Sequence, residues 1–308
     1  MRPGQTSPTR KPAWLRPPQA EPTGFNATAG LLRDLRLTTV CAEARCPNRS
    51  DCYTRGTATF LLLGADCTRR CRFCAVGWNS GRPKRPDPTE PQRVAAAVAR
   101  LGLRHVVLTA STRDDLDDGG AGHIAAVIAA IRSVAPNSSV EALVSDMNGE
   151  EESLNVILAA GPDVLGHNLE TVPRLTPLVR PASSYERSLA LLEAAARSRR
   201  SGLGGATVQG PLVKSGLMLG LGEEVAEVHA VLVDCVAAGV DIVTLGQYLQ
   251  PHLECLPVSR FVPPEEFASL ESWATSHDLV VHAGPLVRSS YRAAELLDRL
   301  RTAGPRSV

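Results

Sequence analysis

The feature that most constrains the fold is a regular alternation, from Thr57 onward, between short apolar segments and longer amphipathic segments. Short apolar segments bounded by turn residues predict buried strands, and the amphipathic segments predict helices that cover them. Six such repeats, at intervals of roughly 30–40 residues, predict an α/β fold whose parallel strands form a partial (β/α)6-type barrel. The predicted strands are residues 57–63, 105–109, 139–144, 163–166, 212–219 and 241–245, and the predicted helices are residues 90–101, 122–134, 152–160, 185–198, 223–238 and 264–276.

Polar residues and cysteines gather where the predicted strands end. In barrels of parallel strands, the carboxyl ends of the strands carry the chemistry. The sequence therefore predicts a site at one end of the barrel, built from residues 64–74, 109–118, 167–170, 220–223 and 246–250.

The loop after the first predicted strand holds three cysteines, Cys67, Cys71 and Cys74. Three thiolates in so short a loop can bind three corners of a cubane iron–sulfur cluster. A structural zinc site usually takes a fourth Cys or His close by, and this loop has none. Three protein ligands would leave one iron of the cluster open for a small molecule.

A second triplet, Cys41, Cys46 and Cys52, lies just upstream. Taken alone, it also fits a zinc knuckle or three reduced thiols. A disulfide framework suits small secreted chains, so the tight clustering favours metal binding. The remaining thiols are isolated: Cys235 is predicted to belong to the core, because a free cysteine behaves as a small apolar residue, and Cys255 is predicted to be an incidental loop thiol.

Charge and composition exclude several classes of protein. Lysine and arginine number 33 against 32 acidic residues, and aromatic residues make up 4%, so nucleic-acid binding is not expected. No stretch reaches the ~18–20 apolar residues that span a bilayer. Residues 1–30 are proline-rich and predict a flexible tail. A mitochondrial transit peptide is conceivable, but the prolines disfavour an amphipathic helix, and we expect a cytoplasmic protein without membrane partners.

The spacing Cys67-x3-Cys71-x2-Cys74 is that of the radical S-adenosylmethionine (SAM) superfamily, and the chain from Lys11 onward resembles one family within it, lipoyl synthase. The upstream triplet and a series of distinctive motifs, in the right order, carry the resemblance. These motifs are Cys-Pro-Asn (46–48), Gly-Thr-Ala-Thr-Phe (56–60), Arg-Asp-Asp-Leu (113–116), His-Asn-Leu-Glu-Thr (167–171), Lys-Ser-Gly-Leu-Met (214–218), Gly-Leu-Gly-Glu (220–223), Leu-Gly-Gln-Tyr-Leu-Gln-Pro (245–251) and Arg-Ser-Ser-Tyr (288–291).

The resemblance implies a radical SAM barrel and, as cofactors, two [4Fe–4S] clusters and SAM. It assigns Cys67, Cys71 and Cys74 to the catalytic cluster, whose open iron is chelated by SAM. Reduction then cleaves SAM and releases a 5′-deoxyadenosyl radical, chemistry that belongs to the cofactors while the barrel orients and shields them.

The resemblance also implies that Cys41, Cys46 and Cys52 hold an auxiliary cluster, with Ser290 as its fourth ligand and its sulfur as the donor. A serine oxygen is a harder, weaker partner for iron than a thiolate. One easily released corner suits a cluster that is dismantled during the reaction. The residues alone would favour Ser290 as the cap of a C-terminal helix.

The implied reaction is that of lipoyl synthase, a sulfurtransferase that inserts two sulfur atoms at C6 and C8 of an octanoyl group on a lysine of a lipoyl carrier protein. The C–H bonds of an octanoyl chain are unactivated, and no side-chain base can deprotonate them, so a radical is needed. The implied partners are lipoyl domains of 2-oxoacid dehydrogenase E2 subunits, the glycine cleavage H protein, an electron donor such as ferredoxin or flavodoxin, and an iron–sulfur carrier that rebuilds the auxiliary cluster.

We predict SAM contacts for three polar residues near the ends of predicted strands, Asn168, Glu170 and Arg180. Polar residues at strand ends can equally have a structural role. The Gly-Leu-Gly-Glu segment at 220–223 is too short for a phosphate loop and predicts a backbone turn near SAM.

Charged residues near the cysteine loop also have two interpretations. Arg69, Arg70 and Arg72 would offset cluster charge or meet an acidic carrier, or they form an ordinary solvated loop. Asp114 and Asp115 would touch substrate or cap a helix.

We divide the chain into a tail (1–30), an auxiliary-cluster extension (31–56), the radical SAM barrel (57–276) and a C-terminal segment (277–308) that covers the barrel mouth and supplies the serine. Departures from the family pattern lie at 75–81, 109–112 and 197–209, the last predicted to be a surface loop. The alternatives are a biotin-synthase-like enzyme, a methylthiolase and a non-catalytic iron–sulfur protein. A biotin-synthase-like enzyme places the ligands of its additional cluster inside the barrel. A methylthiolase carries its extra cysteines in a larger separate domain.

Overall fold

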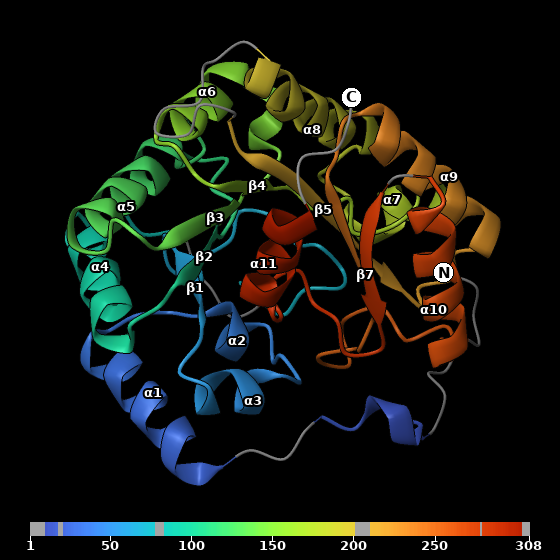
Figure 1. Cartoon of the computed structure of the whole chain (residues 1–308), viewed down its shortest axis with the longest axis horizontal. Coiled ribbons are helices and arrows are strands. Elements are labelled where there is room, and N and C mark those ends of the chain that lie inside the picture. Colours follow the sequence, from blue (N-terminus) through green and yellow to red (C-terminus); the bar gives the residue numbers. More distant parts are fainter. Residues whose placement is uncertain (1–9, 18–20, 78–82, 201–209, 278, 304–308) are drawn as a thin grey trace.

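The computed structural model describes residues 10–17, 21–77, 83–200, 210–277 and 279–303. At its centre, seven strands form one sheet in chain order, and every neighbouring pair is parallel. The sheet curves, and helices line its outer side (Figure 1). The predicted α/β class and partial barrel are therefore confirmed. The strands are β1 (Thr59–Leu62), β2 (His105–Ala110), β3 (Ser139–Leu143), β4 (Val164–Gly166), β5 (Leu212–Leu219), β6 (Ile242–Gln247) and β7 (Val280–Gly284).

The outer helices lie between the strands, as expected for βαβ units. They are α4 (Glu90–Leu101), α5 (Ala121–Val134), α6 (Glu151–Ala159), α7 (Thr176–Val179), α8 (Tyr185–Arg200), α9 (Val225–Ala237) and α10 (Pro264–Thr275). Most predicted boundaries agree to within two residues. Because α8 continues to Arg200, the loop predicted at 197–209 begins as helix, and residues 201–209 lie outside the described part, as do residues 78–81 of the predicted longer turn.

Two features differ from the sequence predictions. A seventh strand, β7, lies in the residues assigned to the C-terminal segment and extends the sheet by pairing with β6. Helix α1 (Pro22–Asp34) occupies the end of the predicted flexible tail. Pro22 stands at the start of that helix, where proline loses no hydrogen bond and its fixed φ favours helix, so the prolines there do not prevent a helix.

The barrel is open between β1 and β7, and residues 22–54 cover the β1 side. Helices α1, α2 (Val40–Glu43) and α3 (Arg49–Thr54) lie below β1 in Figure 1. Thr39 forms an antiparallel bridge with Phe60, and the amide of Leu61 donates to the carbonyl of Thr38 at 2.9 Å. These contacts pair an edge that would otherwise expose backbone groups.

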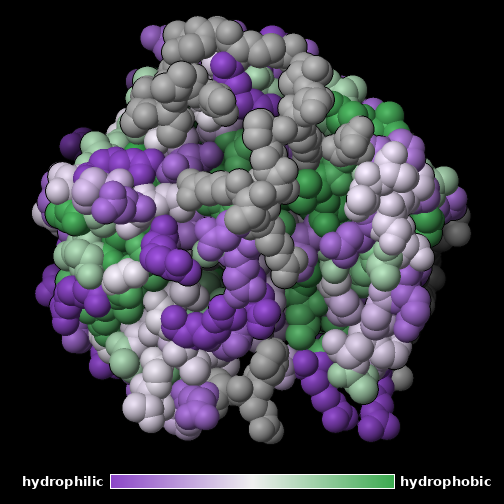
Figure 2. Space-filling view, in the orientation of Figure 1, coloured by the Kyte–Doolittle hydropathy of each residue, from purple (hydrophilic) through white to green (hydrophobic). Residues whose placement is uncertain are grey.

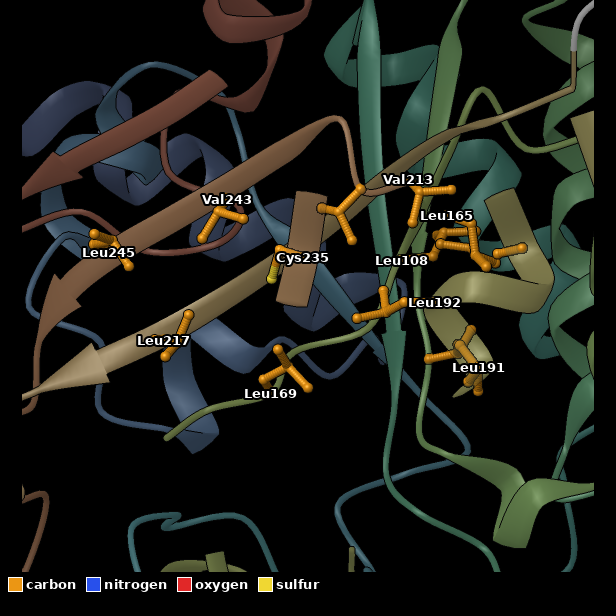
Figure 3. Packing of buried hydrophobic residues seen from close by; sticks show 14 of the residues in the cluster. Leu108, Leu165, Leu169, Leu191, Leu192, Val213, Leu217, Cys235, Val243 and Leu245 are labelled. Atoms are coloured by element: carbon orange, nitrogen blue, oxygen red, sulfur yellow. The ribbon is translucent and has the colours of Figure 1, made fainter. Parts of the chain in front are cut away.

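The core lies between the sheet and the outer helices. Figure 3 shows Val213 and Val243 of the sheet near Leu192 of α8 and Cys235 of α9. Cys235 is buried, so the prediction that it belongs to the core is confirmed. Full burial of each leucine or valine side chain stabilises the fold by roughly 1.5–3 kcal/mol.

The visible face in Figure 1 is mostly hydrophilic, with hydrophobic residues gathered right of its centre (Figure 2). Within the part of the chain that the structure describes, every helix is too short or too polar to span a bilayer.

Candidate active site

The cysteine loop begins where β1 ends and the chain turns sharply. Leu63 and Gly64 both have positive φ, 64° and 77°. A leucine in this conformation is strained, and the amide of Leu63 is held by the carboxylate of Glu90 at 3.0 Å. The same carboxylate contacts Nε2 of His123 at 2.7 Å. The first turn of α4 thus fixes the direction in which the loop leaves the sheet.

Gly77 closes the loop against its first cysteine. Its φ is +80°, and a Cβ placed there would lie 3.0 Å from the Cβ of Cys67 and 3.1 Å from its amide nitrogen. Within the loop, the amide of Cys74 donates to the carbonyl of Cys71 at 3.1 Å. Only glycine fits such a close approach at positive φ without moving its neighbour.

Arg69, between the first two cysteines, is buried and ties the loop to two other strand ends. Its guanidinium donates to Asp114 at 2.8 Å, pairs with the fully buried Asp146 at 2.6 Å and donates to Asn148 at 2.7 Å. Arg69 therefore neither meets a carrier nor forms a solvated loop, and Asp114 pairs with it instead of capping a helix. Arg70, by contrast, is exposed.

The three thiols of the loop lie close enough to interact. Burial is the largest cause that raises the pKa of Cys71 to about 11; Arg180 lowers it, and Cys67 raises it further. Burial likewise raises the pKa of Cys74 to about 12, with added repulsion from Cys71 and Cys67. All eight cysteines lie in the described ranges, and no disulfide joins any of them. Such thiols give up their protons when they bind metal.

The upstream triplet is held on two short helices and the turn between them. Cys41 lies in α2 and Cys52 in α3, and the amide of Cys46 donates to the carbonyl of Cys41 at 3.2 Å. Burial, followed by repulsion from Cys41 and Cys46, raises the pKa of Cys52 to about 12. The turn before Cys46 places Arg45 at a φ of 51°. The three thiols thus form a second group, separate in sequence from the first.

Residues 286–291, here called the serine loop, lie across this extension. The side-chain amide of Asn48 donates to the carbonyl of Leu286 at 2.7 Å, and the hydroxyl of Tyr291 bonds the carboxylate of Asp51 at 3.1 Å. Ser290 also precedes helix α11 (Ala293–Ala303), and the amide of Ala293 donates to the carbonyl of Ser290 at 3.4 Å.

All three cysteines of the loop and two of the upstream triplet open onto one cavity of about 800 Å³ at the carboxyl ends of the strands. This end of the barrel is where the sequence predicts the site. Apolar residues form much of its wall. The predicted site residues that line the cavity are Cys41, Cys46, Cys67, Cys71, Cys74, Asn168, Glu170, Arg180 and Ser290, whereas Cys52 lies outside its lining.

The three predicted SAM contacts form a connected group at the end of β4. The amide of Asn168 donates to Glu170 at 3.1 Å, and the guanidinium of Arg180 donates to the carbonyls of Asn168 and Leu169, each at 3.1 Å. Burial raises the pKa of Glu170, and Arg180 opposes this. Arg180 is therefore partly occupied by structural hydrogen bonds, while all three predicted residues keep a surface toward the cavity.

Other predicted residues lie away from the cavity lining. Glu223 closes its own turn by accepting from the amides of Gly220 and Leu221 at 2.6 and 2.9 Å. Asp115 pairs with Arg113 at 2.7 Å. These side chains stabilise turns that follow cavity-lining residues, Met218 and Thr112, and they do not line the cavity themselves.

Sequence reasoning gave no role to a buried charge pair behind the cavity. Lys214 of β5 and Glu141 of β3 are each 2% exposed, and Nζ lies 2.9 Å from Oε1. Burial would raise the pKa of Glu141, but Lys214 and then His105 lower it, so that it ends below its usual value. Opposite charges inside two predicted buried strands were the signal that could have revealed the pair, because buried charges need partners.

The donor set fits a cluster better than a single ion. Within the described ranges, no three His, Cys, Asp or Glu side chains are arranged around one metal ion. A four-iron cubane is larger than one ion and is held by more widely spaced thiolates. Three interacting thiols on one loop at a cavity are a donor set that suits such a cluster.

Comparison with known proteins gives a consistent family. Residues 61–235 match the model of the radical SAM superfamily. A lipoyl synthase of Thermus thermophilus is 51% identical over 286 residues, which cover 92% of this chain and 85% of that protein. A lipoyl synthase of Chlorobium chlorochromatii is 49% identical and covers 92% of this chain and 94% of that protein.

Solved structures share the fold at low identity. A methylornithine synthase, PylB, superposes with a TM-score of 0.54 at 15% identity and covers 85% of this chain and 72% of that chain. The protein SuiB of Streptococcus suis, solved with S-adenosylmethionine, superposes with a TM-score of 0.53 at 11% identity and covers 73% of this chain and 49% of that chain. At such identities the likeness concerns the fold alone.

Proposed function

The chain belongs to the lipoyl synthase family of the radical SAM superfamily, and on that premise we propose the reaction that its cavity performs. Two sulfur atoms are inserted at C6 and C8 of an octanoyl group that is attached to a lysine of a lipoyl carrier protein. The observation that carries the proposal is the single cavity onto which members of both cysteine triplets and Ser290 open. A radical site and a sulfur source on one cavity wall are what this reaction needs.

We assign Cys67, Cys71 and Cys74 as ligands of the catalytic [4Fe–4S] cluster. When bound, that cluster and SAM together supply a carbon radical able to take hydrogen from an unactivated C–H bond. The chain's own contribution is to hold the loop rigidly, through Gly77 and Arg69, and to present Asn168, Glu170 and Arg180 to SAM. We propose those three as SAM-binding groups.

The apolar part of the cavity wall fits the octanoyl chain. An alkyl chain makes no hydrogen bonds, so its position must come from shape and from exclusion of water. A dry wall also keeps water and other side chains away from a reactive radical. The apolar residues of the lining include Leu15, Phe73, Leu143, Leu217, Met218 and Leu249.

We assign Cys41, Cys46, Cys52 and Ser290 as ligands of an auxiliary [4Fe–4S] cluster that donates sulfur. The interaction among the three thiols and the place of Ser290 on the cavity wall support the assignment. A serine oxygen binds iron more weakly than a thiolate does, which suits a cluster that must give up sulfur.

The partners follow from the reaction. We propose lipoyl domains of 2-oxoacid dehydrogenase E2 subunits and the glycine cleavage H protein as octanoylated carriers, ferredoxin or flavodoxin as electron donor, and an iron–sulfur carrier for rebuilding the auxiliary cluster. We propose a cytoplasmic location. We also propose that an auxiliary-cluster extension precedes the barrel, whose sheet continues to β7, and that the residues after β7 supply the serine.

Two clusters require a definite metal content. Iron and sulfide analysis of the reconstituted protein is expected to give about eight of each per chain, because each cubane holds four. About four of each would remove the auxiliary cluster from the proposal and leave the catalytic one.

Mass spectrometry of an octanoylated carrier tests the reaction itself. The carrier is incubated with the reconstituted protein, SAM and a reductant, and a gain of two sulfur atoms is expected. A gain of one sulfur would favour a biotin-synthase-like enzyme. Absence of both product and 5′-deoxyadenosine would favour a non-catalytic iron–sulfur protein.

A further inference from the structure

A charged pair sits inside the barrel, beneath the serine loop. Nζ of Lys214 donates to Oε1 and Oε2 of Glu141 at 2.9 and 3.0 Å. Nε2 of His105 faces the same carboxylate at 3.4 Å. Removing two charges from water is costly, and a buried pair is tolerated only when further hydrogen bonds satisfy its remaining donors.

The third proton of the ammonium goes to the serine loop. Nζ of Lys214 donates to the backbone carbonyl of Ser289 at 2.6 Å. An ammonium has three donors and no acceptor, so Glu141 and Ser289 use all of them. The pair therefore connects the barrel interior to the residue directly before Ser290.

The serine loop also contacts the barrel through the hydroxyl of Ser289, which donates to Oδ1 of Asn168 at 3.4 Å, and it has two contacts on the auxiliary-cluster extension. Asn48 holds the carbonyl of Leu286, and Asp51 accepts from Tyr291. Asn48 is two residues after Cys46, and Asp51 directly precedes Cys52. Ser290 thus lies between a carbonyl fixed from the barrel side and a side chain fixed from the extension side.

We infer that Lys214, held by Glu141, is a positioning residue for Ser290 and sets the distance between the serine oxygen and the upstream cysteines. The inference rests on the proposed function, in which Ser290 is a ligand of the auxiliary cluster. Lys214 does not line the cavity, so it acts through the backbone of Ser289. Loss of its hydrogen bond removes the shorter of two hydrogen bonds that tie Ser289 to the barrel, the other being the 3.4 Å contact with Asn168, while every cysteine ligand stays in place.

The test separates positioning from folding by changing both charges together. Lys214→Met alone would leave the Glu141 carboxylate buried and unpaired, which is strongly destabilising. The double variant Lys214→Met/Glu141→Met removes the pair, and such replacements are often neutral for stability. Its urea midpoint is therefore expected to match that of the wild type. Should the midpoint fall, Lys214→Met/Glu141→Gln replaces it in the assay, because the glutamine keeps a polar group beside His105 while the methionine has no donor for the carbonyl of Ser289.

Iron release to a chelator is the readout, measured on the reconstituted full-length chain. We expect about four irons to leave the double variant about tenfold faster than the wild type, the effect typical of losing a group that orients a metal ligand. Reductive SAM cleavage, measured on the same samples, is expected to persist and so assigns the lost irons to the auxiliary cluster.

Ser290→Ala is the reference variant and distinguishes the two ways of failing. If Ser290→Ala releases iron faster and the folded double variant behaves like the wild type, the positioning role of Lys214 is wrong and the ligand role stands. If Ser290→Ala also behaves like the wild type, the ligand role fails and the inference falls with it.

Discussion

Replacement of Cys67 with alanine is expected to abolish both reductive cleavage of SAM and formation of the lipoyl group, whereas replacement of Cys41 abolishes only the second. Cys67 belongs to the loop at the end of β1 and Cys41 to helix α2 of the extension. Each variant removes one thiolate from one of the two proposed clusters, so the two chemical steps should separate. The measurements are 5′-deoxyadenosine released under reductant and sulfur gained by an octanoylated carrier.

Cys235→Ala is the matched control, because it removes a thiol that is buried in the core between α9 and the sheet. We expect this variant to keep both activities. Lipoyl formation by the Cys41 variant would contradict the sulfur-donor assignment. Loss of SAM cleavage in the Cys41 variant, together with a lower urea midpoint, would instead indicate damage to the fold.

The fold follows largely from local periodicity. The apolar run that forms β5 and the amphipathic run that forms α4 were predicted to the residue, because each is long and bounded by clear turn residues. Strand β7 was missed because its short run is stabilised by pairing with β6, which no local pattern records. Helix α1 was missed because the prolines of residues 1–18 led to a tail prediction that was extended to residue 30, although α1 itself holds one proline, at its first position.

The candidate site likewise has features that the sequence shows and features that only the folded structure shows. Both cysteine triplets could be recognised because their members lie within a few residues of one another. The Lys214–Glu141 pair joins residues 73 positions apart, and the role of Arg69 depends on carboxylates from two other strand ends. Such pairings depend on which strands and loops the folded barrel brings together, since β3 and β5 are separated by β4, so a single sequence shows the charges without showing their partners.

Arg69→Met is expected to lower the free energy of unfolding by about 3 kcal/mol, near the lower end of the range for breaking a buried ion pair. The side chain of Arg69 is 3% exposed and that of Asp146 is fully buried. Arg187 also pairs with Asp146 at 2.8 Å, and Asp114 is partly exposed, so the loss is less than for a carboxylate left without any cation. Arg70→Met, in the same loop but exposed, is the matched control and should change stability by no more than about 0.5 kcal/mol.

The difference between the Arg69 variant and the wild type should also depend on pH. Burial raises the pKa of Asp146, but Arg69, and after it Arg187, lower the pKa by more than burial raises it. The pKa of Asp146 therefore lies below its usual value. The pKa of Asp114 is lowered in the same manner, with burial opposed chiefly by Arg69. A carboxylate with a depressed pKa stabilises the fold above its unfolded-state pKa of about 4, and this contribution is lost as pH falls through the folded-state value.

The destabilisation caused by Arg69→Met is therefore expected to be full at pH 7 and to shrink as pH falls below about 4, where protonated carboxyls no longer need the guanidinium. The measurement is urea unfolding under anaerobic conditions, at a series of pH values from 7 to below about 4. It gives the free energy of unfolding of the wild type, Arg69→Met and Arg70→Met at each pH. Equal midpoints for Arg69→Met and Arg70→Met at pH 7 would contradict the structural role of the pair. A constant difference at every pH would show that Arg69 stabilises the cysteine loop through packing instead of through its charge.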